Sequence, residues 1–356
     1  MDNRHQILII SRSGDAHATM VGEALIDAGV QVFVRTPQAL IEESVLSIDN
    51  NNIDNKGDKL TFKTFDINDV KIVWLRKPSY FFSNNNAVSA YEHIKWNQKN
   101  LLLGTIYKIL ESNKHLIHCY QTAFISKNKY MQLISAYRVG FRTPLTYYLD
   151  NKELLKNFDV KINKKKWVIK PATEIIFEDE GEMLRYGVSS ITSYEIQRET
   201  EMPLIFQEEI LIKSEIKCAY INGSIFAVEV NVPYSYEDLN DVPYSDRIYK
   251  AVKIPSYIKN KCILLCENLG FIFATIDFLI NNNEEWIFIE INENGQFLFL
   301  EDQCPELPIL QTTINYFLTK LHIYKEKSYR PNNHITFKYY RKRTERQLQN
   351  QLNRKD

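Results

Sequence analysis

The chain has few cysteines, no long apolar run and no excess of charge of either sign. Its five cysteines are odd in number and include no C-x-x-C spacing, which argues against a disulfide framework and against a zinc site. No hydrophobic segment approaches the ~20 residues that span a membrane, and Met1 to Gln6 is polar, unlike a signal peptide. These absences predict a protein of the reducing cytoplasm with no membrane partner.

Positive and negative side chains balance, at 44 lysines plus arginines against 44 aspartates plus glutamates. Without a global positive field, the sequence gives no reason to expect a nucleic acid or an anionic membrane surface as a partner. The 44% apolar and 25% charged content is ordinary for a globular protein, and 356 residues suffice for two or three domains with proper cores.

The first third of the chain alternates short apolar strands with helices. Gln6 to Ile10 and Val30 to Val34 are apolar runs of strand length. The helical pattern between them, Ala16 to Ala28, stops at Gly29. This β-α-β order predicts an open parallel sheet, to which Val73 to Leu75 adds a further buried strand.

From Leu145 onward the pattern changes to short strands with charged connections. Asn222-Gly223 joins the runs Glu215 to Ile221 and Ile225 to Val230, and Asn-Gly between such runs is the strongest two-residue hairpin signal. We therefore expect an α/β domain followed by α+β domains, with a site between the last two. The predicted divisions are residues 1–120, 121–205, 206–330 and a basic tail at 331–356.

Two adjacent apolar runs near the C-terminal end carry three side chains that can bind a metal. Asp277 lies in FIFATIDFLI, and after an Asn-rich turn the next run carries Glu290, with Asn292 two residues further on. Period-two geometry places Glu290 and Asn292 on one face, and a hairpin lays Asp277 opposite them. Such hard oxygen ligands suit Mg²⁺. Capping of strand ends is the alternative, but three polar groups in an apolar hairpin favour a metal, because an unpaired buried carboxylate is costly.

Two lysines are candidates for contact with phosphate. Lys170 ends the strand WVIK and is followed by Pro171, which terminates regular pairing and directs the ammonium away from the sheet. Lys129 stands near the start of the helical pattern that ends at Arg138. Each lysine alone is also compatible with a solvated surface charge.

The strand PLIFQ ends in Gln207 and Glu208, and a hinge strand of this kind offers backbone groups to an adenine edge in an apolar slot. Glu215, seven residues beyond Glu208, is a candidate acceptor for ribose hydroxyls. The alternative for Glu215 is an ion pair with Lys213 or Lys217.

The order of these signals resembles the ATP-grasp ligases over roughly residues 125 to 325. The matching segments are VIKP, PLIFQEEI, EIKCAYINGSIFA, LGFIFATIDFLI and IEINENGQFLFLE. Within that superfamily the chain is most similar to the ligases that cyclise ribosomal peptides, the microviridin-type or graspetide maturases. Three features carry this closer likeness: the opening ILIISRSGDAHATMVGEAL, the segment VWLRKP, and an E-x-N-x-N-G-Q followed by alternating aromatics and a Glu.

The resemblance implies an ATP-grasp fold with an N-terminal open α/β (pre-ATP-grasp) domain, and a reaction that uses ATP and Mg²⁺. ATP-grasp enzymes phosphorylate a carboxylate, and a nucleophile then attacks the acylphosphate. In the peptide cyclases the carboxylate is an Asp or Glu side chain of a precursor peptide, and a Ser or Thr hydroxyl or a Lys amine attacks it. The resemblance assigns phosphate contact to Lys129 and Lys170, the hinge to Gln207 and Glu208, ribose to Glu215, and the metal to Asp277, Glu290 and Asn292.

Phosphoryl transfer depends on positioning and electrostatic stabilisation, and it requires no covalent enzyme nucleophile. We therefore interpret His17 as a polar residue where a loop enters a helix, and not as a base.

The chain departs from the family pattern at several places. Many members of the group carry Asp-aliphatic-Arg where this chain has Glu215-Ile216-Lys217, and lysine lacks the bidentate fork that suits a carboxylate or acylphosphate. Arg247 resembles the arginine that meets the substrate carboxylate, although the usual aromatic before it is missing. The glycine-rich phosphate flap expected before Leu204 has only Gly181 and Gly187.

The implied partner is a ribosomal precursor peptide, and relatives that pair suggest a homodimer. Tyr234, Tyr236 and Tyr244, near Arg247, form the favoured substrate-facing loop. The basic tail attracts an acidic core peptide or is a solvated helix.

Two alternatives to peptide cyclisation stay open. One is an ATP-grasp carboxylate-amine ligase that adds an amino acid to a protein terminus or a small molecule. The other is a non-catalytic nucleotide-binding regulator, against which the complete set of Asp277, Glu290 and Asn292 argues.

Overall fold

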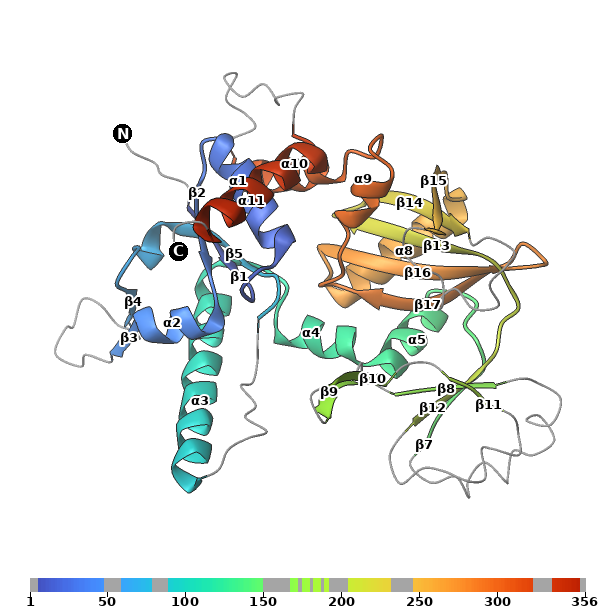
Figure 1. Ribbon diagram of the computed structural model, residues 1–356, viewed down its shortest axis with the longest axis horizontal. Coiled ribbons are helices and arrows are strands. Elements are labelled where there is room, and N and C mark those ends of the chain that lie inside the picture. The colour runs from blue at the N-terminus through green and yellow to red at the C-terminus, as the bar shows by residue number, and fades with distance from the viewer. Residues whose placement is uncertain are drawn as a thin grey trace. The chain divides into compact units, whose positions relative to one another are not determined.

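The computed structural model divides the chain into two compact units: unit 1, residues 1–120 with 298–356, and unit 2, residues 121–297 (Figure 1). The structure describes residues 6–47, 59–78, 89–149, 167–171, 175–179, 182–186, 189–191, 204–231, 246–322 and 335–352. No helix within these ranges is long and apolar enough to cross a membrane.

Unit 1 is built on a parallel sheet in the order β2-β1-β5-β6. Its strands are β1 (Gln6–Ile10), β2 (Gln31–Arg35), β5 (Val70–Leu75) and β6 (His115–Ile117). All five residues of β1 are buried, because this central strand is covered on both faces. The parallel sheet predicted from the β-α-β opening is confirmed.

Helices and one hairpin surround this sheet. They are α1 (Ala16–Asp27), α2 (Pro37–Glu43), α3 (Ala90–Asn113), a 3₁₀ turn η1 (Ile67–Asp69), and the antiparallel pair β3 (Ser44–Ser47) and β4 (Lys59–Phe62). The Asp15 carboxylate caps α1 by accepting from the amides of His17 and Ala18. Gly29, at a φ of +83°, ends the turn that follows α1.

His17 is a buried structural residue of unit 1. Its Nε2 accepts the backbone N–H of Leu298 at 2.9 Å. Burial and the nearby positive charges of Arg76 and Lys77 hold the pKa of His17 well below its ordinary value. A neutral imidazole that accepts a backbone amide fits the interpretation of His17 as a polar structural residue.

The C-terminal segment belongs to unit 1 and forms α9 (Phe299–Gln303), α10 (Ile309–Lys320) and α11 (Phe337–Leu352). The buried carboxylate of Glu301 accepts the amide of Leu310 at 2.6 Å and that of Phe337 at 2.7 Å. Glu301 therefore caps the starts of both α10 and α11, although neither amide is close to it in sequence.

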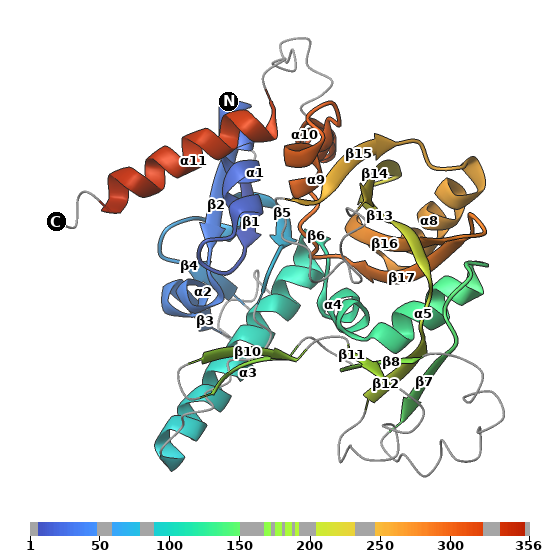
Figure 2. The ribbon, with the colours of Figure 1, turned by 45° about the vertical axis from the view of Figure 1, so that its right-hand side comes forward.

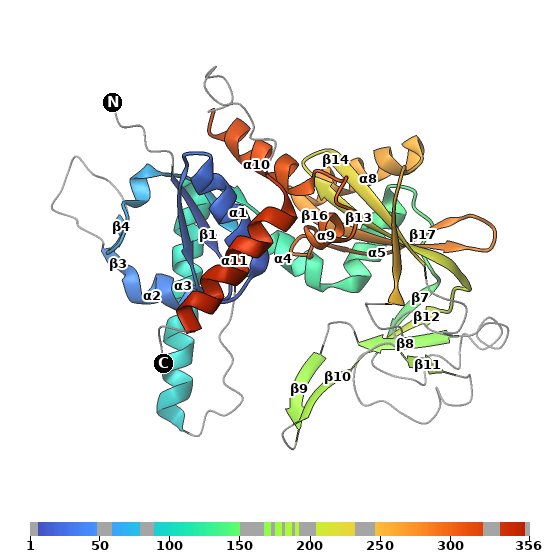
Figure 3. The ribbon, with the colours of Figure 1, turned by 45° about the horizontal axis from the view of Figure 1, so that its top comes forward.

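Helix α11 lies along α1 (Figure 3). Arg343 pairs with Glu23 and Asp27, and the Tyr340 hydroxyl donates to Asp27 at 2.9 Å. The tail that the sequence marked as basic is thus a helix with some of its charges paired. The sequence-based division grouped residues 298–330 with 206–297, whereas contacts in the structure group residues 298–356 with 1–120.

The larger sheet of unit 2 is antiparallel, in the order β15-β14-β13-β16-β17. Its strands are β13 (Ile212–Ile221), β14 (Ser224–Asn231), β15 (Ile248–Val252), β16 (Phe273–Asn281) and β17 (Trp286–Asn292). Asn222 and Gly223 both have positive φ, at 42° and 92°, which is the backbone of a type I′ turn. The hairpin predicted from Asn-Gly is confirmed.

One face of this sheet packs against α5 (Lys129–Arg138) and α8 (Ser256–Leu269), which Figure 2 shows beside it. The shared core takes alternate residues of the strands and apolar faces of the helices. Its members include Ile216, Cys218, Tyr220, Ile276 and Phe278 from the sheet, and Leu133, Ala136, Ile258, Cys262 and Cys266 from the helices. All five cysteines of the chain are free thiols.

A second antiparallel sheet of unit 2 has the order β11-β8-β12-β7. Its strands are β7 (Thr146–Leu149), β8 (Trp167–Pro171), β11 (Ser189–Ile191) and β12 (Leu204–Glu208), and its core contains Trp167, Ile169 and Phe206. The segment where we expected a glycine-rich flap contains a hairpin of β9 (Ile175–Asp179) and β10 (Glu182–Tyr186). Helix α4 (Tyr120–Lys127) precedes α5.

Candidate functional site

A row of three charged residues crosses the large sheet of unit 2. Lys217 on β13 is the register partner of Asp277 on β16, and Asp277 is the register partner of Glu290 on β17. Register partners in an antiparallel sheet point to the same face. These three side chains therefore stand side by side on the face opposite the core, as the hairpin pattern predicted for Asp277 and Glu290.

A β-bulge beside this row gives Glu290 its direction. The register shifts so that Asp277 pairs with Glu290 while Phe278 pairs with Phe288, which leaves Ile289 as the extra residue. Strict alternation would place Phe288 and Glu290 on one face. With the bulge, Phe288 and Ile291 enter the core and Glu290 turns to the opposite face.

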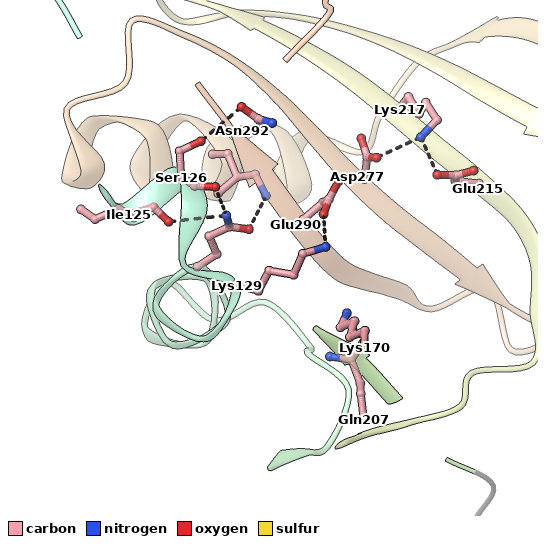
Figure 4. A network of polar contacts seen from close by, with 12 residues as sticks. Ile125, Ser126, Lys129, Lys170, Gln207, Glu215, Lys217, Asp277, Glu290 and Asn292 are labelled. Carbon is pink, nitrogen blue, oxygen red and sulfur yellow. Dashed lines mark hydrogen bonds and ion pairs between the residues drawn. The ribbon is translucent and has the colours of Figure 1, made fainter. Parts of the chain in front are cut away.

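Lysines hold all three carboxylates of the site, as Figure 4 shows. The Lys217 ammonium lies 2.6 Å from Oε1 of Glu215 and 2.9 Å from Oδ2 of Asp277. Lys129, at the start of α5, lies 3.1 Å from Oε2 of Glu290. The pairing of Glu215 with Lys217 is one of the two alternatives that the sequence left open for that acid.

These contacts shift the ionisation of the site. Burial raises the pKa of Asp277 to about 6, with Lys217 opposing the shift and Glu290 and Glu215 adding to it. Burial acts to raise the pKa of Glu290, but the charge and hydrogen bond of Lys129 together with the charges of Lys170 and Lys217 outweigh it, and the pKa lies below its ordinary value. Burial acts to lower the pKa of Lys217, but Asp277 and Glu215 raise it well above its ordinary value.

Lys170 and Gln207 form a second polar pair, on neighbouring strands β8 and β12. The Lys170 ammonium donates to Oε1 of Gln207 at 2.7 Å, and Nε2 of Gln207 donates to the Thr146 hydroxyl at 2.9 Å. Lys170 is only 5% exposed. Burial, followed by the positive charge of Lys129, lowers its pKa to about 8, while Glu290 acts in the opposite direction. Lys170 therefore belongs to the same electrostatic cluster as Lys129 and Glu290.

Sequence reasoning missed Ser126 and Gln132, which fasten β17 to α4 and α5. Gln132 is buried, accepts the Ile291 amide at 3.1 Å and donates to the Ser126 carbonyl at 2.6 Å. The Ser126 hydroxyl donates to Oδ1 of Asn292 at 3.2 Å and accepts the Glu293 amide at 3.1 Å. This clasp, residues Ser126 and Gln132, fixes the strand that carries Glu290 against the helix that carries Lys129. No short-range pattern signals it, because its partners are about 160 residues apart.

The side-chain oxygen of Asn292 already accepts two hydrogen bonds. Its Oδ1 accepts from the Ser126 hydroxyl and from the Asn294 amide, the latter at 2.9 Å. Since an amide oxygen has two lone pairs, Asn292 ligates a metal only when one of these donors turns away. The Asn294 bond is part of the tight turn that follows β17, which leaves the Ser126 hydroxyl as the movable partner.

Gly295 is required by the close approach of this turn to β16. A Cβ at Gly295 would lie 2.6 Å from Cγ2 and 2.8 Å from Cβ of Thr275, closer than real contacts allow. Thr275 is the register partner of Asn292. The glycine of the N-G-Q segment therefore lets the turn lie directly over the strand that carries Asp277.

Strand β12 ends at Glu208, the second residue of the predicted hinge. The Glu208 amide donates to the Leu145 carbonyl at 2.8 Å, and its carboxylate accepts the Leu145 amide at 3.3 Å. The next three residues, Glu209 to Leu211, lie in no helix or strand. The hinge role of Gln207 and Glu208 stays a prediction.

Arg247 lies one residue before β15, at the same end of the sheet as Glu215. Ile248 pairs with Asn231 and Glu215 pairs with Val230, so the two positions are close along the strands but separated by β14. Arg247 is half-buried. The loop tyrosines proposed beside it, Tyr234, Tyr236 and Tyr244, lie outside the described residues.

The described part of the chain contains no cluster of three His, Cys, Asp or Glu side chains arranged for a metal. The predicted set consists of two carboxylates and one amide. Its donors are all oxygen, which fits Mg²⁺ and not zinc. Oε2 of Glu215 is buried with no hydrogen-bond partner among the described residues, so the cluster holds unused acceptor capacity beside Asp277.

No protein-family model matches the sequence, and a search of the curated proteins found no match. Solved structures do match over most of their length. One is the macrocyclase MdnC of Microcystis aeruginosa bound with its precursor peptide MdnA, with a TM-score of 0.72, 21% identity, 88% of this chain covered and 99% of that chain. A second is a RiPP-associated ATP-grasp ligase of Chryseobacterium gregarium in complex with ADP and a leader and core peptide, with a TM-score of 0.70, 20% identity, and 92% and 99% covered.

A third is the ATP-grasp ligase PsnB complexed with a minimal precursor, Mg and ADP, with a TM-score of 0.67, 14% identity, and 90% and 99% covered. At these identities the likeness shows the fold. The chain has the ATP-grasp fold with an N-terminal α/β unit, and the predicted fold class is confirmed.

Proposed function

We propose that this chain is an ATP-dependent macrocyclase of a ribosomally made precursor peptide. It activates Asp or Glu side chains of the peptide as acylphosphates, for attack by a Ser or Thr hydroxyl to give an ester or by a Lys amine to give an amide. The observation that carries the proposal is the row Lys217, Asp277 and Glu290, with Lys129 and Lys170 beside it, in an ATP-grasp fold. Structural neighbours crystallised with precursor peptides support the substrate class.

The reaction has two steps. A carboxylate oxygen of the peptide attacks the γ-phosphorus of ATP, the bond to the bridging oxygen breaks, and ADP leaves. The hydroxyl or amine then attacks the acyl carbon and loses its proton, and inorganic phosphate leaves. Both steps develop charge on phosphate oxygens, which fixed cations stabilise. No side chain of the enzyme forms a bond to the substrate.

Lys129 and Lys170 are the proposed phosphate contacts. Both belong to one electrostatic cluster, and Lys170 is buried and donates to Gln207. The adenine is proposed to meet the hinge backbone at Gln207 and Glu208, and Glu215 to accept from the ribose through the oxygen that Lys217 does not use.

Asp277, Glu290 and Asn292 are the proposed magnesium ligands. Mg²⁺ bound there with nucleotide phosphates would supply charge neutralisation of the triphosphate. The structural neighbour with Mg and ADP supports this choice of cofactors. Lys217 and Arg247 are proposed to meet the substrate carboxylate and its acylphosphate, since Lys217 is a cation on β13 and Arg247 is a cation that lies one residue before β15 of the same sheet.

The test is mass spectrometry of a candidate precursor peptide, sought among short open reading frames next to the gene and incubated with the full-length protein, ATP and Mg²⁺. Each ester or amide formed removes one water from the peptide. Glu290→Gln is expected to abolish the loss, whereas Glu284→Gln, an exposed acid in the turn of the same hairpin, retains it. Unchanged peptide mass with a verified cognate precursor contradicts cyclisation.

The same assay separates the alternatives. A carboxylate-amine ligase increases the mass of its acceptor by an added amino acid, and a regulator consumes no ATP. We further propose a cytoplasmic protein that assembles as a homodimer, which light scattering of the purified protein tests.

A further inference from the structure

Among the described residues, the charges of the candidate site balance one another. Three carboxylates, those of Glu215, Asp277 and Glu290, share one cluster with three lysines, Lys129, Lys170 and Lys217. Every one of the carboxylates has a lysine within 3.1 Å. Each proposed metal-binding carboxylate is thus already paired with a positive charge before any cation arrives.

A divalent cation entering this site alone would have to displace or repel those ammonium groups. The Lys217 ammonium lies between two carboxylates, on the central strand of the sheet, with its side chain 24% exposed. At such partly buried positions water screens charge weakly, so ammonium and cation compete strongly for the same oxygens.

We propose that Lys217, assisted by Lys129, is an internal counter-ion that excludes divalent cations from Asp277 and Glu290 until nucleotide phosphates provide the lysines with other partners. Metal and nucleotide therefore enter the site as one event. The inference rests on the proposed function, because it takes Asp277 and Glu290 as the metal ligands.

The contacts of the two lysines indicate which contributes more to the exclusion of divalent cations. Lys217 contacts two carboxylates and extends from a strand bonded on both sides, whereas Lys129 contacts one carboxylate from the first turn of a helix. Removal of Lys217 leaves both Glu215 and Asp277 without their cation. Exclusion therefore depends more on Lys217 than on Lys129.

This role also gives a reason for the departure from arginine that the sequence showed. A compact ammonium on a flexible stem exchanges partners readily, whereas a guanidinium fork holds a carboxylate through two bonds. Lys217 can hold Asp277 in the absence of nucleotide and release it when phosphates are present.

The experiment is titration of the full-length protein with Mn²⁺, followed by electron paramagnetic resonance of the free ion, without and with ADP. Wild type without nucleotide is expected to bind Mn²⁺ weakly and to gain affinity when ADP is added. Lys217→Met without nucleotide is expected to bind about tenfold more tightly than wild type or better, because charges in an ion pair interact by more than the ~1.4 kcal/mol that tenfold represents.

Two variants serve as controls. Lys217→Arg retains the charge and is expected to exclude Mn²⁺ as wild type does. Lys213→Met removes an exposed lysine of the same strand that pairs with Glu284, and it is expected to match wild type. If Lys217→Met does not fold, Lys129→Met takes its place and is expected to bind Mn²⁺ more tightly than wild type, by a smaller factor; affinity equal to wild type then overturns the proposal.

The outcomes distinguish failure of the counter-ion proposal from failure of the proposed metal site. Equal Mn²⁺ affinity of wild type and Lys217→Met without nucleotide overturns the counter-ion proposal alone, provided that ADP still brings Mn²⁺ into the wild-type site. Failure of wild type to take up Mn²⁺ even with ADP overturns the metal site of the proposed function.

Discussion

Nucleotide affinity should depend on the protonation of Lys170, which the structure places in an unusual setting. Its ammonium is buried, bonded to Gln207 and near the charge of Lys129, and its pKa is lowered to about 8. A lowered pKa means that the proton is lost at a lower pH than in an ordinary lysine. Lys170 is therefore charged below about pH 8 and neutral above it, and its attraction for phosphate is lost as the pH rises.

The size of the effect follows from the protonated fraction. Between one unit below and one unit above a pKa, that fraction falls about tenfold, so ADP affinity should fall about tenfold between roughly pH 7 and pH 9. Isothermal titration calorimetry at fixed Mg²⁺ measures it. Buffers of different ionisation enthalpy should also reveal proton uptake on binding near pH 8, because phosphate stabilises the charged lysine.

Two variants test whether Lys170 causes the fall in ADP affinity. Lys170→Arg keeps its charge at every working pH, so its affinity should not fall over this range. Lys129→Met removes a neighbouring positive charge and should move the fall to higher pH. A wild-type affinity that is constant from pH 7 to 9, or an equal fall in Lys170→Arg, would refute the assignment of Lys170 to phosphate.

Three further changes test the scaffold of the site by urea unfolding. Gly295→Ala should destabilise the protein by about 1–3 kcal/mol through overlap with Thr275. Combination with Thr275→Ala should recover part of this loss. If the destabilisations of the two single variants simply add in the double variant, the contact is not the cause. Gln132→Leu leaves the buried Ile291 amide unsatisfied and should lower the free energy of unfolding by about 1–3 kcal/mol. ADP binding should also weaken, because β17 is less firmly held. Unchanged stability would show that the clasp is dispensable. Glu301→Gln retains one acceptor oxygen but loses the charge that two amides share. The free energy of unfolding should fall by about 1–3 kcal/mol at neutral pH. A variant as stable as wild type would mean that α10 and α11 form without the Glu301 carboxylate.

Local patterns predicted the parts of the fold that depend on neighbours in sequence. Asn222-Gly223 predicts a type I′ hairpin because few other dipeptides accept positive φ at both positions. The pairing of Asp277 with Glu290 follows from two apolar runs joined by an Asn-rich turn. Neither inference required knowledge of distant contacts.

The remaining features depend on tertiary contacts that no local pattern encodes. The bulge at Ile289 is imposed by the need to bury Phe288 and Ile291 together, and the residue itself carries no signal. Glu301 resembles any surface acid in sequence, and its role as a double cap exists only after α10 and α11 are in place.

The return of residues 298–356 to unit 1 has a consequence for biosynthesis. The N-terminal sheet leaves the ribosome long before α10 and α11 are translated, so it must wait, without part of its cover, while the whole of unit 2 is made and folds. The first 120 residues should therefore be the part of the chain that depends on chaperones. A truncation after Phe297 would destabilise the N-terminal sheet and not the large sheet of unit 2.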